Sequence, residues 1–94
     1  MQIKWLSKAL KNLQDEAEYI AEDNPQAAQQ VVQRIYAAVS QLTDQPASGR
    51  PGRVLGTREL VVANTRYIIP YRVRNNSIEV LRVFHTSRKP PKGW

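Results

Sequence analysis

The chain has 94 residues, no cysteine, a single histidine and a formal net charge of +6. The lack of cysteine excludes disulfides, thiolate zinc sites and thiol nucleophiles, and with one histidine we expect no metal and no other cofactor. The length supports one core, and no apolar run approaches the roughly 20 residues that cross a bilayer, so we expect a single cytoplasmic domain over residues 1–94 with no membrane partner.

The first half of the chain predicts a short strand followed by a helical hairpin. Residues 2–6 alternate apolar and polar side chains, as expected of an edge strand. Within residues 7–44, apolar side chains recur three or four positions apart in two segments, which indicates two amphipathic helices. Asn24 and Pro25 separate the helices, because asparagine is a typical N-cap and proline a typical first helical residue. The acidic side chains of the first helix are expected on its solvated face; they are Asp15, Glu16, Glu18 and Glu22.

The second half predicts β-structure. Prolines and glycines punctuate residues 45–56, which indicates a loop. Residues 57–85 predict a three-stranded meander, whose last turn holds Asn75 and Asn76, residues suited to the positive φ angles of a two-residue hairpin. A basic tail follows over residues 86–94. The expected fold is therefore α+β, of order β-α-α-β-β-β, with the helical hairpin packed on one face of a small, mainly antiparallel twisted sheet.

The hairpin turn also predicts the strand register, and with it the side chains that share a face. In this register the facing residues include Tyr71 and Val80, Arg72 and Glu79, and Tyr67 and Phe84. The face expected under the helices is formed by Tyr67, Ile69, Tyr71, Val73, Ile78, Val80 and Phe84. The opposite face mixes cationic and apolar side chains and includes Arg66, Ile68, Pro70, Arg74, Leu81, Val83 and His85. Because of its apolar members, we expect this second face to be partly covered by the tail or by a partner chain.

Positive charge is concentrated in the predicted sheet and tail. Residues 1–49 carry four basic and six acidic side chains, a balance of 4 − 6 = −2, whereas residues 50–94 carry ten basic and two acidic ones, a balance of 10 − 2 = +8. Eight of these ten are arginines, whose planar guanidinium groups suit phosphate and carboxylate oxygens. The second half therefore indicates an anionic partner.

Four segments of the second half resemble a known family. They are Gly49-Arg50-Pro51-Gly52, Thr57-Arg58-Glu59-Leu60-Val61-Val62, Tyr67-Ile68-Ile69-Pro70-Tyr71-Arg72-Val73 and Ile78-Glu79-Val80-Leu81-Arg82-Val83-Phe84-His85. Their order is similar to the pattern of the RelE/ParE superfamily, the toxins of type II toxin-antitoxin modules, over about residues 3–90. The resemblance implies a growth-inhibiting toxin that a cognate antitoxin neutralises in a hetero-oligomer, in a kind of module that also serves plasmid maintenance.

The resemblance implies two alternative targets. ParE-like toxins act on DNA gyrase without an established cleavage chemistry of their own, whereas RelE-like toxins are ribosome-dependent endoribonucleases that cut mRNA without a metal. We favour the ParE-like branch, because Ile68 stands where the ribonuclease branch usually carries an arginine or a lysine. The alternatives are the mRNA endoribonuclease and, from the charge alone, a non-enzymatic nucleic-acid-binding module. Whether the chain is an enzyme depends on this choice.

The candidate site residues lie almost entirely in the second half. In a nuclease, His85 would act as general acid or base and Arg82 would neutralise the phosphate, so these are the catalytic candidates. Those expected to bind the target are Arg58, Arg66, Arg82, His85, Arg88 and Lys89. Those expected to bind the antitoxin are Arg66, Ile68, Leu81 and Val83.

Overall fold

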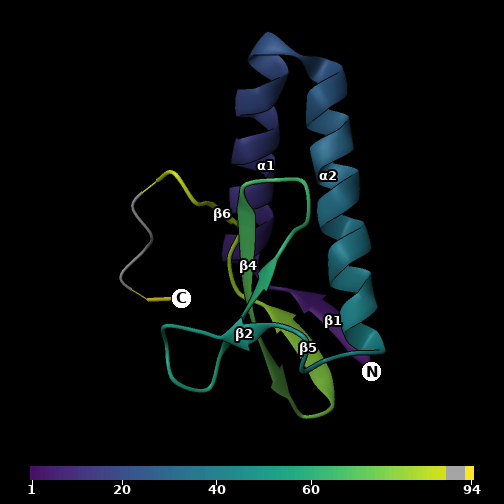
Figure 1. Cartoon of the computed structure of the whole chain (residues 1–94), viewed down its shortest axis with the longest axis vertical. Helices are drawn as coiled ribbons and strands as arrows, with labels where there is room; N and C mark the ends of the chain where they lie inside the picture. Colours follow the sequence, from purple (N-terminus) through teal and green to yellow (C-terminus); the bar gives the residue numbers. More distant parts are fainter. Residues whose placement is uncertain (89–92) are drawn as a thin grey trace.

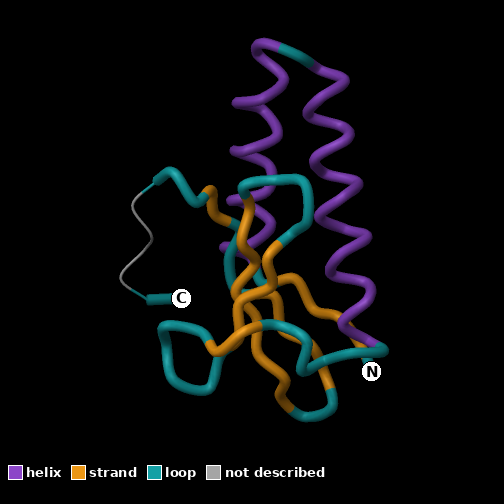
Figure 2. The backbone as a smooth tube through the Cα atoms, viewed as in Figure 1, coloured by secondary structure: helices purple, strands orange, loops and turns teal. Residues whose placement is uncertain are grey.

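Two helices pack against one face of a mixed sheet in the computed structural model, which describes residues 1–88 and 93–94 (Figure 1). In chain order the elements are β1 (Gln2–Trp5), α1 (Ser7–Asp23), α2 (Pro25–Ser40), the short 3-10 helix η1 (Gln41–Thr43), β2 (Arg50–Pro51), β3 (Arg58–Val61), β4 (Tyr67–Arg74), β5 (Ser77–Val80) and β6 (Phe84–His85). The strands gather at one end of the molecule, and the two helices run past them side by side (Figure 2). The predicted α+β fold is confirmed.

The helical hairpin turns at Asn24 and Pro25, as the sequence predicts. Asn24 caps α2, since its Oδ1 accepts the N–H of Ala27 at 3.1 Å, and Pro25 fills the first helical position. This cap satisfies one of the backbone donors that have no partner inside a helix. The two helices therefore meet at a tight, defined turn. Neither helix in the described part of the chain has the length and apolar character needed to span a membrane.

The sheet has the strand order β1-β5-β4-β3-β2, and β6 continues along β4 beyond β5. All its strand pairs are antiparallel except β1 and β5, which run parallel. The two-residue strand β2, inside the segment expected to be a loop, pairs with β3. Because β1 pairs with β5, the first strand of the chain lies beside the β4–β5 hairpin.

The predicted register is confirmed in the β4–β5 hairpin, where Tyr71 faces Val80. Asn75 and Asn76 have φ angles of 50° and 58° in the turn, as expected. The register expected further along is wrong, because Tyr67 faces His85 instead of Phe84. One additional residue has been accommodated between β5 and β6.

Pro70 explains where the ladder between β4 and β5 ends. The N–H of Leu81 donates to the Pro70 carbonyl at 2.8 Å, but the return bond of such a pair requires an N–H that proline lacks. The chain leaves the ladder here and is held by α1, where Asn12 Oδ1 accepts the N–H of Val83 at 3.2 Å. The result is a bulge over residues 81–83.

The bulge places Val83 and Phe84 on the opposite faces of the sheet from those expected. Val83, expected opposite the helices, is 3% exposed and belongs to the core, whereas Phe84, expected in the core, stacks on Trp94. Val73, also expected under the helices, is 45% exposed. The expected face is confirmed for the other five residues, which are Tyr67, Ile69, Tyr71, Ile78 and Val80.

Tyr71 ties the loop before β2 to the core. Its ring is fully buried, and its hydroxyl donates to the Pro46 carbonyl at 2.7 Å and accepts the N–H of Gly49 at 2.9 Å. A Cβ at Gly49 would lie 2.6 Å from Tyr71 Cε1, so only glycine allows this approach.

We expect Tyr71→Phe to lower the free energy of unfolding by about 1–3 kcal/mol, because a buried N–H and a partly buried carbonyl lose their partner. Urea unfolding followed by circular dichroism measures this change. Tyr36→Phe is the matched control: Tyr36 is largely exposed and keeps its ring contact with Trp5, so its effect should stay within about 0.5 kcal/mol. Equal losses in the two variants would contradict the role given to the Tyr71 hydroxyl.

Candidate functional site

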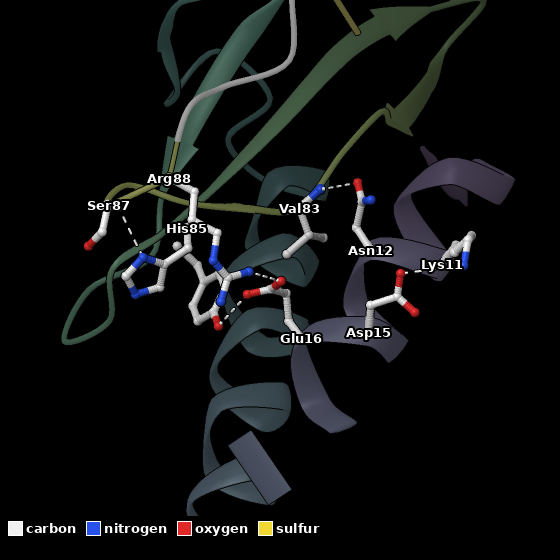
Figure 3. A network of polar contacts seen from close by, with 9 residues as sticks. Lys11, Asn12, Asp15, Glu16, Val83, His85, Ser87 and Arg88 are labelled. Atoms are coloured by element: carbon white, nitrogen blue, oxygen red, sulfur yellow. Dashed lines mark hydrogen bonds and ion pairs between the residues drawn. The ribbon is translucent and has the colours of Figure 1, made fainter. Parts of the chain in front are cut away.

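Glu16 joins α1 to the end of the sheet. Its carboxylate accepts a hydrogen bond from the Tyr67 hydroxyl at 2.9 Å and another from the guanidinium group of Arg88. Figure 3 shows the Glu16 side chain directed from α1 toward Arg88, beyond β6. The Glu16 side chain is only 13% exposed, so a charge-assisted partner is needed to offset its desolvation.

Two aromatic contacts complete this group, which we call the Glu16 cluster: Glu16, Tyr19, Tyr67, His85 and Arg88. The guanidinium carbon of Arg88 lies 5.0 Å from the centre of the Tyr19 ring, a cation–π contact. The rings of Tyr67 and His85 meet edge to face, with 5.2 Å between their centres. Between these side chains lies an open hollow of about 370 Å³.

The hydrogen bonding of His85 fixes which ring nitrogen carries its proton. The backbone N–H of Ser87 donates to His85 Nδ1 at 3.1 Å, so Nδ1 is unprotonated and the neutral ring carries its proton on Nε2. In this state the ring offers a partner a hydrogen-bond donor. The geometry thus favours a binding role for His85, as a hydrogen-bond donor through Nε2, over that of a general acid or base.

The environment of Tyr67 keeps its hydroxyl protonated. Burial, and then the hydrogen bond to Glu16, raise the pKa of Tyr67 well above its ordinary value. The phenol therefore remains a donor to Glu16 throughout the neutral range, and it leaves the second oxygen of Glu16 to Arg88.

The two residues expected to form a nuclease pair have different contacts in the structure. His85 contacts Tyr67 and Ser87, whereas the Nε of Arg82 donates to the Trp94 carbonyl at 3.4 Å. Among the described residues no partner is shared by these two side chains. Arg82 lies within the bulge between β5 and β6, whereas His85 lies in β6.

The other residues expected to bind the target have different surroundings. Arg58 donates to the carbonyls of Gly49 at 2.9 Å and Ala47 at 3.3 Å, so it holds the loop before β2. Arg66 is exposed, and its carbonyl accepts the N–H of Thr86 at 2.8 Å, which places it beside the end of β6. Lys89 lies outside the described residues.

The residues expected to bind the antitoxin are mostly not on the surface. Ile68 and Leu81 are 6% and 5% exposed, and the placement of Val83 on the outer face is wrong because the bulge turns it into the core. Of this group only Arg66 is exposed.

Three arginines of the second half are neutralised within the fold. Arg50 pairs with Glu59 at 3.1 Å and Arg72 with Glu79 at 2.5 Å, the latter as predicted, and Arg88 pairs with Glu16. The hydrogen bond from Arg72 lowers the pKa of the Glu79 carboxyl. Within residues 1–88 and 93–94, the arginines of the second half without a carboxylate partner are Arg53, Arg58, Arg66, Arg74 and Arg82.

Glu16 was not among the expected site residues and was instead expected on the solvated face of the first helix. Glu16 lies one helical turn from Leu13 and Ile20 of the apolar stripe, and this spacing was the available signal. The signal is weak, because the partners of Glu16 lie more than 50 residues further along the chain.

A second feature lies on the helical hairpin. An open groove of about 670 Å³ runs between α1 and α2 and is lined by Ala17, Glu18, Ala21, Pro25, Ala28, Gln29, Val32 and Gln33. Three alanines along its length leave the helix backbones accessible to another helix. We call it the hairpin groove.

We expect Glu16→Gln to lower the raised pKa of Tyr67 while leaving it above the ordinary value of about 10, because burial remains. Since folding raises this pKa, its contribution to stability is complete below pH ~10 and is lost as the pH rises further; the variant should lose less stability over that range. Near-ultraviolet phenolate absorbance and urea unfolding at alkaline pH measure both effects, with Tyr67→Phe to identify the signal. Glu18→Gln, on the exposed side of α1, should leave the titration unchanged, and an equal shift in that control would contradict the assignment.

Comparison with known proteins identifies the family. Residues 3–90 match the family model described as the ParE toxin of the type II toxin-antitoxin system parDE. The chain is 48% identical over 90 residues to "Putative toxin Y4kP" of Sinorhizobium fredii, covering 96% of this chain and 93% of that protein. It is 33% identical over 87 residues to "Toxin RelE2" of Caulobacter vibrioides, covering 93% and 97%.

A solved structure agrees with the sequence relatives. The chromosomal ParDE toxin-antitoxin system from P. aeruginosa matches with a TM-score of 0.81 and 31% identity, over 90% of this chain and 95% of that one. The match covers both helices and the sheet, so the same fold carries the family pattern. The chain therefore belongs to the ParE toxin family of type II toxin-antitoxin systems.

Proposed function

We propose that this ParE-family toxin inhibits DNA gyrase in the cytoplasm by binding it, without cleaving nucleic acid itself, and that a cognate antitoxin neutralises it in a hetero-oligomer. The observation that carries the proposal is that the side chains of His85 and Arg82 share no partner among the described residues. Metal-independent RNA cleavage needs an acid, a base and a phosphate-stabilising cation around one phosphate. Arg88, which lines the same hollow as His85, is paired with Glu16.

The surface proposed for the target is formed by Arg66, His85 and Arg88, and we call it the Arg66 surface. Arg66 and His85 are neighbours because the Thr86 N–H bonds to the Arg66 carbonyl. Arg66 has no carboxylate partner within the described residues, so its charge is available to an acidic partner. Lys89, which follows Arg88 in the sequence, remains part of the proposed target contact.

Arg66→Glu should weaken inhibition of gyrase supercoiling about tenfold or more, since an exposed cation becomes an anion facing the same partner, a cost of at least about 1.4 kcal/mol. The measurement is a supercoiling assay with purified gyrase over a range of toxin concentrations. Arg74→Glu is the matched control, because Arg74 is also an exposed arginine but lies at the opposite end of β4. If both variants weaken inhibition equally, net charge and not the Arg66 surface is responsible.

The target itself is tested by running a ribosome-dependent mRNA cleavage assay in parallel. Unmodified toxin should inhibit gyrase and leave mRNA intact. Activity in the ribosomal assay alone would overturn the proposal in favour of the ribonuclease alternative, to which the name of the Caulobacter relative points. In that case His85→Ala should abolish cleavage, and the gyrase assay should show no effect of any variant.

For neutralisation we propose that an amphipathic helix of the antitoxin lies in the hairpin groove. Family membership supports an antitoxin partner, and the residues first expected to bind it are buried, apart from Arg66. Small side chains at Ala17, Ala21 and Ala28 allow a helix to approach closely and bury its apolar face. An acidic segment continuing from this helix would reach the free arginines.

Ala21→Arg should fill the groove and raise the antitoxin concentration needed for neutralisation by about tenfold or more, while toxicity without antitoxin stays unchanged. Growth assays with titrated antitoxin expression, and calorimetry on the purified pair, measure the two quantities. Ala37→Arg is the control, because Ala37 is exposed on α2 and does not line the groove. Neutralisation unaffected by Ala21→Arg would place the antitoxin elsewhere.

A further inference from the structure

Trp94 is held outside the core by four side chains. Its ring stacks on Phe84, with 5.6 Å between the ring centres and 21° between the planes. The guanidinium carbon of Arg53 lies 5.6 Å from the Trp94 ring centre. The indole Nε1–H donates to Thr57 Oγ1 at 3.0 Å, and the Trp94 carbonyl accepts from Arg82 Nε at 3.4 Å. We call these four residues, Arg53, Thr57, Arg82 and Phe84, the Trp94 site.

The acceptor of this site, Thr57 Oγ1, is held in place by contacts that do not involve Trp94. The Thr57 hydroxyl donates its own proton to the Val54 carbonyl at 2.6 Å, so its lone pairs remain for a ring N–H. Gly52 supports the arrangement, because a Cβ there would lie 2.3 Å from Thr57 Oγ1. Thr57 is therefore held in place by its own loop.

None of these contacts requires tryptophan. A flat ring that stacks on Phe84 and lies against a guanidinium group, with an N–H for Thr57 and an oxygen for Arg82, fits equally the unpaired base of a nucleic acid. Thymine and uracil both carry a ring N–H next to carbonyl oxygens. The site thus presents a stacking surface, an acceptor and a cation in the arrangement that such a base would use.

The surroundings of Trp94 are cationic. Two open hollows of about 400 and 340 Å³ border it, the first lined by Arg72 and Arg74 among others, the second by Lys8 and Arg72. Arg72 is paired with Glu79, whereas Lys8 and Arg74 have no carboxylate partner in the part of the chain that the structure describes. These cations would face the phosphates on either side of a bound base. An aromatic side chain of a protein partner would bring no such charges.

We propose that the Trp94 site binds an unpaired thymine or uracil base of single-stranded nucleic acid and that Trp94 occupies the site when no such strand is present. This inference is independent of the gyrase proposal, since it concerns other residues and a different ligand. Trp94 then competes with the strand. The apparent affinity for the strand equals the affinity of the open site multiplied by the fraction of molecules in which the site is open.

The first test is fluorescence anisotropy with a labelled oligothymidylate and with its duplex on oligoadenylate. Trp94→Ala should tighten binding of the single strand about tenfold if Trp94 fills the site in ~90% of molecules. It should change duplex binding less than about twofold, because paired bases cannot enter. Circular dichroism confirms that the variant is folded. Unchanged single-strand binding, or an equal gain for the duplex, would overturn the proposal, the latter because charge alone would then explain it.

Two further variants probe the acceptor in the Trp94→Ala background. Thr57→Val keeps the shape of the side chain and removes the acceptor, so it should abolish the gain for the single strand, whereas Thr57→Ser should retain it. A gain that survives Thr57→Val would show that the base does not use this site, and would contradict the proposal.

The second test uses Trp94 as its own reporter. The chain has two tryptophans, so Trp5→Phe leaves Trp94 as the only one, and Phe retains the aromatic contact with Tyr36. The emission of Trp94 should change on titration with oligothymidylate and not with the duplex. A change caused by antitoxin and not by oligothymidylate would overturn the proposal and identify the site as a protein contact.

Discussion

The arrangement of the second half depends on the hydrogen bond that Pro70 is unable to donate. Leu81 gives its N–H to the Pro70 carbonyl, but no bond returns, and the β4–β5 ladder stops. The chain resumes pairing one residue out of register, which turns Val83 inward and sends Phe84 and His85 to positions that regular alternation would not give them. Asn12 supplies the acceptor that the Val83 N–H lost with the ladder. The hydrogen bond that the Val83 N–H loses in the sheet is thus replaced by a hydrogen bond to the Asn12 side chain of the first helix.

Helix α1 consequently makes two sets of polar contacts besides covering the sheet. Asn12 holds the bulge, and Glu16, one turn further along, binds both Tyr67 and Arg88. A buried carboxylate costs free energy unless it is paired, so Glu16 ties the segment after β6 to the helix. The Glu16 carboxylate also neutralises the charge of Arg88, which lines the hollow beside His85. Two cationic regions remain, one around Arg66 and one around Trp94. Different elements of the fold form them.

Local signals predicted the parts of the fold that depend on local chemistry. Asn24 with Pro25 defined the helix boundary, and Asn75 with Asn76 defined the hairpin turn and the register next to it. Proline in mid-strand is expected at a bulge or where its strand needs no donor, as Pro70 indicated, but the register shift that moves Val83 and Phe84 was not predicted, because the strand pattern continues through residues 81–83. The candidate site was predicted less well than the fold. Arg66 and His85 were expected on the same face of the sheet, but the contacts around His85 depend on Glu16, and Trp94 was left without a position. Both depend on contacts between distant segments, which side-chain periodicity does not encode.

The parallel pairing of β1 with β5 has a consequence for the order in which this chain acquires its structure. Gln2 pairs with Ser77, a separation of 77 − 2 = 75 residues, and closing so large a loop is slow compared with forming a helix or a hairpin. During synthesis the helical hairpin emerges long before the strand that completes the sheet beside it. A nascent chain therefore presents the apolar faces of both helices to its surroundings until the final hairpin has left the ribosome, and a binding partner already present in the cell could engage those helices before the sheet is complete.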